Sequence, residues 1–340
     1  SFWSTLRSVR CRPRNKVGDI PKDNWQKHFV SVFEATLQPQ IPAIYYDDIE
    51  EISEDPDQIT LNSAITREEI IDSIHHLKSN KAGGPDGLIP EVFIHSAHLI
   101  IPYLENLFNY TFTSGEYPGS WTEAIIQPIY KRGNLNDPSN YRGISLLNSC
   151  SKLYSYILNK RLTKWIEDKG IIGEEQAGFR KDHCTIDHVF TLFAAIKKHL
   201  ASNKKLYVAF IDFKKAFDLI SHAKLWPIML KNGISGKMLR AIQSMYKVVK
   251  ASVRCNNGAG LTDFFFCQKG LKQGEITSPL LFSMVINELS LDVIQNGKHG
   301  VQLHPDVIEL IIILFADDVA LMSYSVKGLQ HQIDLLCKNA

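Results

Sequence analysis

Two adjacent aspartates, Asp317 and Asp318, stand between two short, mainly apolar segments at residues 308–315 and 319–322. Both segments are rich in residues that favour β-structure, which predicts two strands joined by a tight acidic turn. Acidic turns are common where a chain reverses direction at the surface. For this pair taken alone we therefore favour a solvated turn.

A third aspartate, Asp212, changes that balance because it ends another apolar segment at residues 206–212. Apolar residues on both faces of that segment predict a central, buried strand. Three carboxylates converging at the mouth of a sheet would repel one another, and a bound divalent cation removes that cost. Two such ions can activate an attacking 3′-hydroxyl and stabilise a leaving pyrophosphate. A strand-end aspartate with a hairpin Asp-Asp is thus the minimal layout of a nucleotidyl transferase.

Composition sets broad limits on the remaining possibilities. The chain has 340 residues, which predicts two or three subdomains, and 44% hydrophobic residues, which excludes a disordered chain. A net charge of +2 argues neither for nor against nucleic acid. The six cysteines show no zinc-ligand spacing and are interpreted as reduced thiols of an intracellular protein. The longest apolar run, residues 310–316, is too short to span a bilayer.

Periodicity predicts an alternation of helices and strands. Helices are expected at residues 24–37, 66–78, 90–114, 150–168, 185–201, 222–248 and 279–294. Thr66 and Glu69 form the pattern of a capping box. Strands at 121–130 and 141–147 predict a hairpin with a long basic tip, and residues 251–268 are β-like. The acidic stretch 45–60 is expected to be a loop, and the basic residues of 1–20 a solvated arm.

Six segments, taken together, resemble the motifs of reverse transcriptases of the non-LTR retrotransposon class, and they occur in that family's order. They are residues 81–87 (Lys-Ala-Gly-Gly-Pro-Asp-Gly), 140–147 (Asn-Tyr-Arg-Gly-Ile-Ser-Leu-Leu), 176–180 (Gln-Ala-Gly-Phe-Arg), 210–218 (Phe-Ile-Asp-Phe-Lys-Lys-Ala-Phe-Asp), 273–282 (beginning Gln-Gly) and 315–318 (Phe-Ala-Asp-Asp). Any one of them can occur by chance, whereas six in order over residues 65–325 are strong evidence.

The resemblance implies a catalytic set of Asp212, Asp317 and Asp318. Asp212 and Asp317 would bridge two Mg²⁺ or Mn²⁺ ions with Asp318 beside them, and Phe213 completes the expected metal site. Phe217 matches the bulky residue that screens the sugar 2′ position and favours dNTPs. From the pattern alone, a core aromatic residue is the better interpretation of Phe217.

Further residues are implied to bind the substrates. Lys131 and Arg142 match fingers residues that hold the incoming triphosphate, as two cations on a hairpin can. Without the resemblance, Lys131 is a solvated turn charge. Gln273 and Gly274 would lie beside the nascent base pair, where a missing side chain leaves room for template and primer.

Template or primer contacts are implied for two more cations. Lys81 belongs to the N-terminal motif, and Arg180 is a candidate either for template contact or for structural pairing. His183 and His188 are expected to be surface or hydrogen-bonded core histidines and not metal ligands.

Three positions depart from the family pattern. Glu275 stands where a Cys-Pro or similar pair usually follows Gln-Gly, and it adds a negative charge near the primer and the dNTP. That charge either weakens binding or is a variant of this lineage. Gly143 replaces a frequent proline after the fingers arginine, and Gly83 replaces the first proline of the N-terminal motif. None of the three removes a metal ligand.

The implied fold is an α+β right-hand polymerase with an antiparallel palm sheet backed by helices. We expect an N-terminal extension at 1–65, fingers at 66–205, a palm at 206–325 and the start of a truncated palm-to-thumb segment at 326–340, so that the thumb is largely absent. The implied function is RNA-directed DNA polymerase, in the cytoplasm, the nucleus or both. Its partners would be an RNA template, a DNA primer and dNTPs, with no membrane and no protein partner specified.

Two other functions stay open from the sequence. An inactive nucleic-acid-binding remnant would keep the basic residues without needing the acids, and the three intact aspartates disfavour it. An RNA-templated RNA polymerase shares the palm, but Phe217 at the sugar-screening position argues against it.

Overall fold

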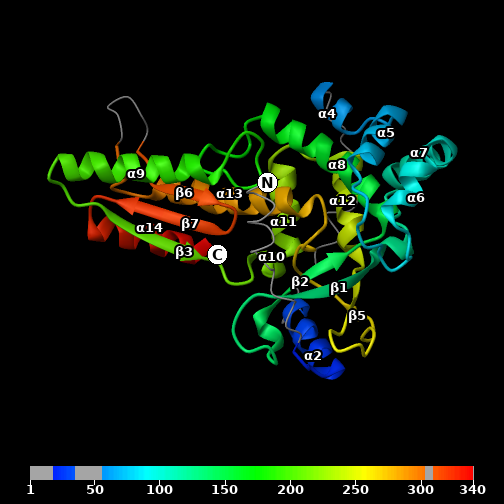
Figure 1. The fold of residues 1–340 in the computed structure, drawn as a ribbon. Coiled ribbons are helices and arrows are strands. Elements are labelled where there is room, and N and C mark those ends of the chain that lie inside the picture. The colour runs from blue at the N-terminus through cyan, green and yellow to red at the C-terminus, as the bar shows by residue number, and fades with distance from the viewer. Residues whose placement is uncertain (1–17, 35–55, 303–308, 340) are drawn as a thin grey trace, which may run out of the picture. The chain divides into compact units, whose positions relative to one another are not determined.

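The computed structural model describes residues 18–34, 56–302 and 309–339. The chain forms two units, each built from three separate stretches (Figure 1). The first comprises Ser1–Gln38, Ile65–Tyr154 and Ala241–Glu275, and the second comprises Pro39–Ala64, Ser155–Arg240 and Ile276–Ala340. The units interleave in sequence, whereas the expected fingers and palm are each one continuous range.

The first unit is built on a four-stranded sheet of order β2-β1-β4-β5. Its strands are β1 (Glu123–Tyr130), β2 (Tyr141–Leu146), β4 (Lys250–Val253) and β5 (Phe265–Phe266). β1 and β2 pair antiparallel over six residues each, from Ile125 opposite Leu146 to Tyr130 opposite Tyr141, which confirms the predicted hairpin. β4 joins β1 in parallel, so the sheet brings together segments far apart in the sequence.

Helix α2 (Lys22–Phe33) packs on this sheet through its apolar face. Trp25 and Phe29 are buried against Ile126 and Tyr141, and the Trp25 ring meets the Tyr141 ring edge-on at 4.9 Å. The helical spacing of the aromatic residues predicted this helix, although it ends at Phe33.

The first unit also contains the helices α5 (Arg67–His76), α6 (Pro90–His95), α7 (Ala97–Ser114) and the short 3₁₀ helix η2 (Gly119–Thr122). The capping box predicted at Thr66 is present. The Glu69 N–H donates to the Thr66 hydroxyl, and the Thr66 N–H donates to the Glu69 carboxylate. Both bonds satisfy donors that a helix start leaves unpaired.

The second unit is built on a three-stranded antiparallel sheet of order β3-β7-β6. Its strands are β3 (Tyr207–Asp212), β6 (Ile312–Phe315) and β7 (Asp318–Ser323). α9 (Thr185–Ala201) packs on it through Ala195, and α14 (Val326–Asn339) packs against β3 and β7, so helices flank the sheet (Figure 1). α14 is the segment in which we expected a thumb to begin.

The remaining helices are α4 (Pro56–Leu61), α8 (Ser149–Asp168), α10 (Ala216–Leu219), α11 (His222–Lys231), α12 (Gly236–Lys247) and α13 (Ser278–Asn296), with the short 3₁₀ helix η3 (Pro138–Asn140) in the hairpin tip. In the described part of the chain, no helix is long and apolar enough to cross a bilayer.

Two expectations about these elements are wrong. β3 is an edge strand among the described strands and is not central, and Phe210 within it is 75% exposed. The apolar residues of a segment show that it can be buried. Its place in the sheet depends on which other strands pair with it. The end of the expected 45–60 loop, from Pro56, is helix α4; the rest of that loop and the basic residues of 1–17 lie outside the described residues.

Candidate active site

The acidic centre lies at one end of the second unit's sheet. Asp212, the last residue of β3, is directly opposite Asp318, the first residue of β7. Directly paired residues of an antiparallel ladder point to the same face, so the two carboxylates share one face. Asp317 lies in the turn between β6 and β7. The sequence therefore predicted the hairpin and its acidic tip correctly.

The predicted convergence of three carboxylates is not present. Among the residues described, no three His, Cys, Asp or Glu side chains lie close enough together to hold a metal ion. Asp317 lies in the turn, outside the strand pairing that sets Asp212 opposite Asp318.

The donor set nevertheless suits a divalent cation of the magnesium type. Asp212 and Asp318 offer carboxylate oxygens from one face, and Asp317 offers a third carboxylate one residue away. Such hard oxygen donors are what Mg²⁺ prefers, and it commonly keeps several water ligands in addition to one or two carboxylates. Phe213 has no side-chain donor, so its carbonyl oxygen is all that it can offer.

A pocket of about 340 Å³ opens beside the two opposed aspartates. Its walls are mainly apolar and come from α9 and from the three strands, including Val189, Phe210 and Phe315. Asp212 and Asp318 line it as well. The acidic centre therefore borders a partly apolar recess.

The turn that carries Asp317 is supported by the segment 175–178. Glu175 and Ala177 exchange backbone hydrogen bonds with Leu314 in β6, at 2.7 and 3.0 Å. Gly178 lies so close that an added Cβ would be 2.2 Å from the Ala316 nitrogen. The Gln176 side chain is fully buried and its carbonyl oxygen accepts from the N–H of Ala316 at 3.1 Å. Sequence reasoning grouped these residues with a motif but missed that they hold the acidic turn.

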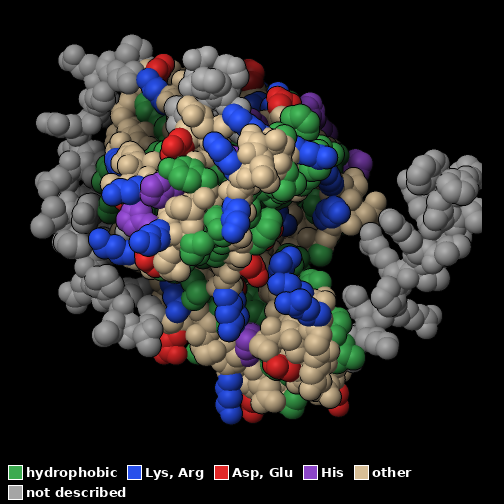
Figure 2. All heavy atoms as spheres, turned by 90° about the vertical axis from the view of Figure 1, so that its left-hand side faces the viewer, with side chains coloured by type: hydrophobic (Ala, Val, Ile, Leu, Met, Phe, Trp, Pro, Cys, Tyr) green, Lys and Arg blue, Asp and Glu red, His purple; other side chains and the backbone are tan. Residues whose placement is uncertain are grey.

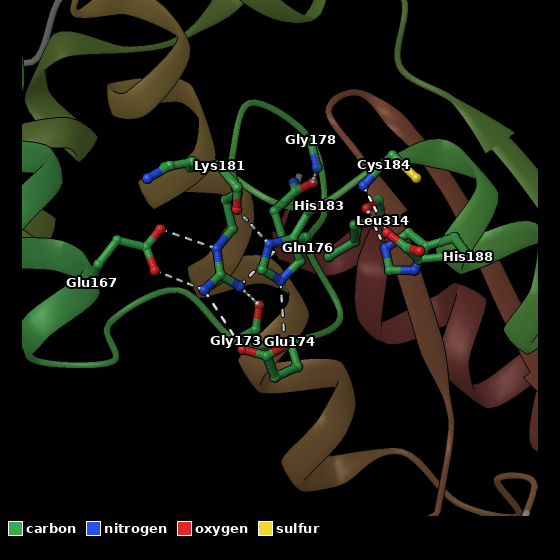
Figure 3. A network of polar contacts seen from close by, with 12 residues as sticks. Glu167, Gly173, Glu174, Gln176, Gly178, Lys181, His183, Cys184, His188 and Leu314 are labelled. Carbon is green, nitrogen blue, oxygen red and sulfur yellow. Dashed lines mark hydrogen bonds and ion pairs between the residues drawn. The ribbon is translucent and has the colours of Figure 1, made fainter.

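Arg180 bonds to Glu167 and to Gly173, two residues of the polar network drawn in Figure 3. Its guanidinium pairs with Glu167 at 2.9 Å and donates to the carbonyl oxygen of Gly173 at 2.9 Å. The side chain is only 8% exposed, and the pairing with Glu167 raises the pKa of Arg180. Of the two roles considered for Arg180, structural pairing is the one that the second unit displays.

His188 and His183 are hydrogen-bonded as expected. The His188 Nε2 is 3.0 Å from the Leu314 carbonyl oxygen, so that nitrogen carries the proton (Figure 3). The His183 ring bonds the Lys181 carbonyl oxygen and lies near the Glu174 carboxylate. Both contacts raise the pKa of His183.

Phe217, the expected sugar-screening residue, lies in an aromatic stack. Its ring is parallel to that of Phe282 at 4.3 Å and meets the ring of Phe179 edge-on at 5.9 Å. It is partly exposed. The stack fixes the orientation of the ring and is compatible with either role considered for it.

The expected triphosphate-binding residues lie together on the β1–β2 hairpin of the first unit. Arg142 is opposite Ile129, and the Lys131 N–H bonds the Asn140 carbonyl just beyond the last strand pair. Because side chains alternate along a strand, Lys131 and Arg142 lie on one face of the hairpin. Both are exposed.

Gly143, one of the departures from the family pattern, has a packing reason. A Cβ at this position would be 2.7 Å from the Phe29 ring of α2. The glycine therefore makes room for α2 on the hairpin.

Gln273 and Gly274 pack against β2 in the first unit. The Ser145 N–H donates to the Gln273 carbonyl at 2.7 Å. Gly274 has a φ of 109°, and a Cβ there would be 2.9 Å from the Ser145 carbonyl oxygen. The missing side chain of Gly274 thus serves an intramolecular contact, which sequence reasoning did not anticipate.

Glu275 was expected to add a negative charge near the primer and the dNTP. Its side chain is 3% exposed and lies inside the first unit near Lys272. Burial lowers the pKa of Lys272, and the Glu275 carboxylate opposes that shift. Burial also raises the pKa of Tyr117, and the Glu275 charge adds to that effect.

Lys81 is exposed on a loop of the first unit. The loop is pinned where the Asp86 N–H donates to the Asn148 side chain and the Ser149 hydroxyl donates to the Leu88 carbonyl. More generally, Figure 2 shows Lys and Arg side chains spread among apolar and acidic ones on the face in view.

The predicted site residues thus fall into two sets. The first unit holds Lys81, Lys131, Arg142, Gln273 and Gly274, and the second holds Arg180, Asp212, Phe213, Phe217, Asp317 and Asp318.

Comparison with known proteins identifies the class. Residues 129–339 match the family described as reverse transcriptase (RNA-dependent DNA polymerase). This match covers more than half of the sequence, so the chain belongs to the reverse transcriptase family. It confirms the resemblance drawn from the six motifs.

Two similar curated proteins come from Drosophila melanogaster. The chain is 26% identical to the probable RNA-directed DNA polymerase from transposon BS, over 99% of the chain and 38% of that protein. It is 25% identical to the corresponding protein from transposon X-element, over 94% of the chain and 35% of that protein. The chain therefore spans a little over a third of the length of these relatives.

A solved structure of telomerase from Candida albicans, in complex with a fragment of telomeric RNA, aligns with a TM-score of 0.45 and 13% identity. The alignment covers 68% of this chain and 42% of that one, a likeness too low to assign a fold.

Proposed function

We propose that this chain carries the polymerase core of an RNA-directed DNA polymerase of a non-LTR retrotransposon. The observation that carries the proposal is the pairing of Asp212 with Asp318 at a sheet end, next to Asp317, within a chain of this family. The reaction would be addition of dNTPs to a primer 3′-hydroxyl on an RNA template.

The second unit would then be the palm and the first unit the fingers. In this assignment the palm includes residues 155–205, which were expected in the fingers, and α14. The β1–β2 hairpin with Lys131 and Arg142 would be the part of the fingers that binds the triphosphate.

Each residue would have a defined task. Asp212, Asp317 and Asp318 would hold two Mg²⁺ or Mn²⁺ ions, with the Phe213 carbonyl as a further oxygen donor. When bound, the ions would supply activation of the primer hydroxyl and charge stabilisation on the leaving pyrophosphate. Lys131 and Arg142 would neutralise and orient the triphosphate.

Selection of the nucleotide and of the strands would use other residues. Phe217, oriented by its stack on Phe282, would exclude a 2′-hydroxyl. Gln273 and Gly274 would border the new base pair, and Lys81 would contact the template or primer backbone. Such substrates would place the enzyme inside the cell, in the cytoplasm, the nucleus or both.

Primer extension on poly-rA/oligo-dT with dTTP and Mg²⁺ or Mn²⁺ tests the proposal. The chain should extend the primer, and the Asp317→Ala/Asp318→Ala variant should not. A folded chain that binds the hybrid but never extends it would overturn the proposal and favour the binding remnant. Efficient use of rUTP in place of dTTP would favour an RNA polymerase instead.

A further inference from the structure

The backbone that directs the two adjacent aspartates has an unfavourable conformation. Ala316, directly before Asp317, has a φ of 58°, in the left-handed region that residues with a Cβ rarely adopt. A two-residue hairpin turn can place its first residue there, but that position favours glycine, so alanine is strained and depends on its surroundings. Because the next peptide starts from Ala316, its backbone angles set the directions of Asp317 and Asp318.

The Gln176 side chain hydrogen-bonds to the backbone of Ala316. Its Oε1 accepts from the Ala316 N–H at 3.1 Å and from the Gly178 N–H at 2.7 Å. Its Nε2 lies 3.4 Å from the Ala316 carbonyl oxygen. The Gln176 amide thus contacts both the N–H and the carbonyl oxygen of Ala316, as the backbone of a neighbouring strand would.

The Gln176 side chain is itself held tightly. Residue 176 lies in the segment that pairs with Leu314, beside β6. Gly178 allows the segment to approach the Ala316 backbone closely, and His188 bonds the Leu314 carbonyl from α9 (Figure 3). Gln176 is fully buried, so it cannot exchange its bonds to Ala316 for water.

We propose that Gln176 is a positioning residue that fixes the left-handed Ala316 and thereby aims Asp317 and Asp318 at the metal and substrate site. This inference rests on the proposed function of the acidic centre. Gln176 acts through the backbone of Ala316 and not on the reacting atoms. Small displacements of catalytic groups are costly, on the order of 10²-fold in rate for about 1 Å.

The test compares Gln176→Met with a matched control. Methionine keeps the length and fills the space but makes neither bond to Ala316. The control is Gln332→Met, because Gln332 is another fully buried glutamine of the same unit. Its amide donates to the carbonyls of Met322 and Lys298, away from the acidic turn. Both variants lose comparable buried hydrogen bonds, so both should be less stable to heat.

The two variants should differ in function. We expect Gln176→Met to lower kcat per folded molecule by about 10²-fold, with KM for dTTP changed less than about threefold. It should also weaken Mn²⁺ binding. The electron paramagnetic resonance signal of free Mn²⁺ measures this binding, and the Asp317→Asn/Asp318→Asn variant gives the background from Mn²⁺ bound elsewhere. Gln332→Met should keep both kcat and Mn²⁺ binding close to those of the unmodified chain.

The outcomes separate the two proposals. Unchanged kcat in folded Gln176→Met, with an active unmodified chain, would overturn the positioning role and leave the polymerase intact. If the unmodified chain never extends a primer but Gln176→Met, unlike Gln332→Met, weakens Mn²⁺ binding, the positioning role of Gln176 is supported and the proposed polymerase function is overturned. Equal effects of the two glutamine variants on Mn²⁺ binding would reduce Gln176 to a stabilising residue and overturn the inference.

Discussion

Asp212 and Asp318 face each other directly across the pair of strands β3 and β7. Both are exposed, and like charges directly opposite one another destabilise a sheet. A bound cation would reverse that effect by compensating both charges at once. If the pair holds the metal ions as proposed, metal binding and sheet stability would depend on the same two residues.

From this pair we expect Asp318→Asn to reduce primer extension on the order of 10³-fold, since it removes a carboxylate that would hold a metal ion. Without divalent metal the variant should melt at or slightly above the temperature of the unmodified chain. Added Mg²⁺ should raise the melting temperature of the unmodified chain more than that of the variant. Asp334→Asn, on α14 in the same unit, is the control and should behave like the unmodified chain. Equal Mg²⁺ responses of all three would contradict the expectation.

Arg180 should matter for stability and not for hybrid binding. Arg180→Met removes the pairing with Glu167 and leaves the Gly173 carbonyl without its guanidinium donor. We expect a loss of about 1–3 kcal/mol in the free energy of unfolding, measured by urea denaturation. The Kd for an RNA–DNA hybrid should change less than about twofold. The control is Lys181→Met, whose side chain is 89% exposed and should tolerate the change. A tenfold higher Kd for the hybrid, with an unchanged free energy of unfolding, would instead assign Arg180 to template contact.

Gly274 should resist substitution because of its backbone and its neighbour. Gly274→Ala would place a Cβ at a φ of 109° and 2.9 Å from the Ser145 carbonyl oxygen. We expect a loss of more than about 1 kcal/mol in the free energy of unfolding. The matched control is Gly119→Ala, since nothing lies within 4 Å of a Cβ there. Equal stability of the two variants, by chemical denaturation, would show that the turn at Gly274 relaxes freely.

Cys150 should be slow to alkylate, and its rate should climb with pH. Burial, aided by the Asp86 charge, raises the pKa of the Cys150 thiol to about 12. Only the thiolate reacts, so at pH 8 roughly one Cys150 in 10⁴ would be reactive. Because the raised pKa favours the protonated thiol, the rate should rise about tenfold per pH unit below pH 12 while the chain stays folded. Iodoacetamide labelling followed by mass spectrometry measures this, with exposed Cys184 as the internal comparison. Equal labelling of the two at pH 8 in the folded chain would contradict the prediction.

The hairpin cations should affect nucleotide binding. Arg142→Met should raise KM for dTTP about tenfold, because it removes a charge-assisted contact with the triphosphate. Lys131→Met should act in the same direction, since both side chains share one face of the hairpin. Arg132→Met is the control, because Arg132 is exposed and adjacent to Lys131 but lies in the bend beyond the strand pairs. A KM that responds to Arg132→Met as strongly as to Arg142→Met would argue for a diffuse charge effect.

Local chemistry explains which features were predictable. Two strand-like segments on either side of a polar turn predicted the β1–β2 hairpin, and the apolar runs around Asp317 predicted the β6–β7 hairpin. The Thr66 capping box depends on residues three apart, so it could be read from the chain alone. The order of six motifs identified the family, as the match over residues 129–339 confirms.

Contacts between distant segments decided the rest. The edge position of β3 depends on which strands pair with it, and the pairing of Asp212 with Asp318 depends on their register. Glu275 and Gln176 belong to residue types that are mostly exposed in proteins, yet both are buried.

The sequence by itself thus determined the family, the two hairpins and the three acids, because periodicity and turn chemistry act between near neighbours. Only the tertiary structure decided that Asp318 faces Asp212, that Arg180 pairs with Glu167 and that Gln176 holds Ala316. Each of these depends on burial and strand register, which arise when segments far apart in the chain pack together.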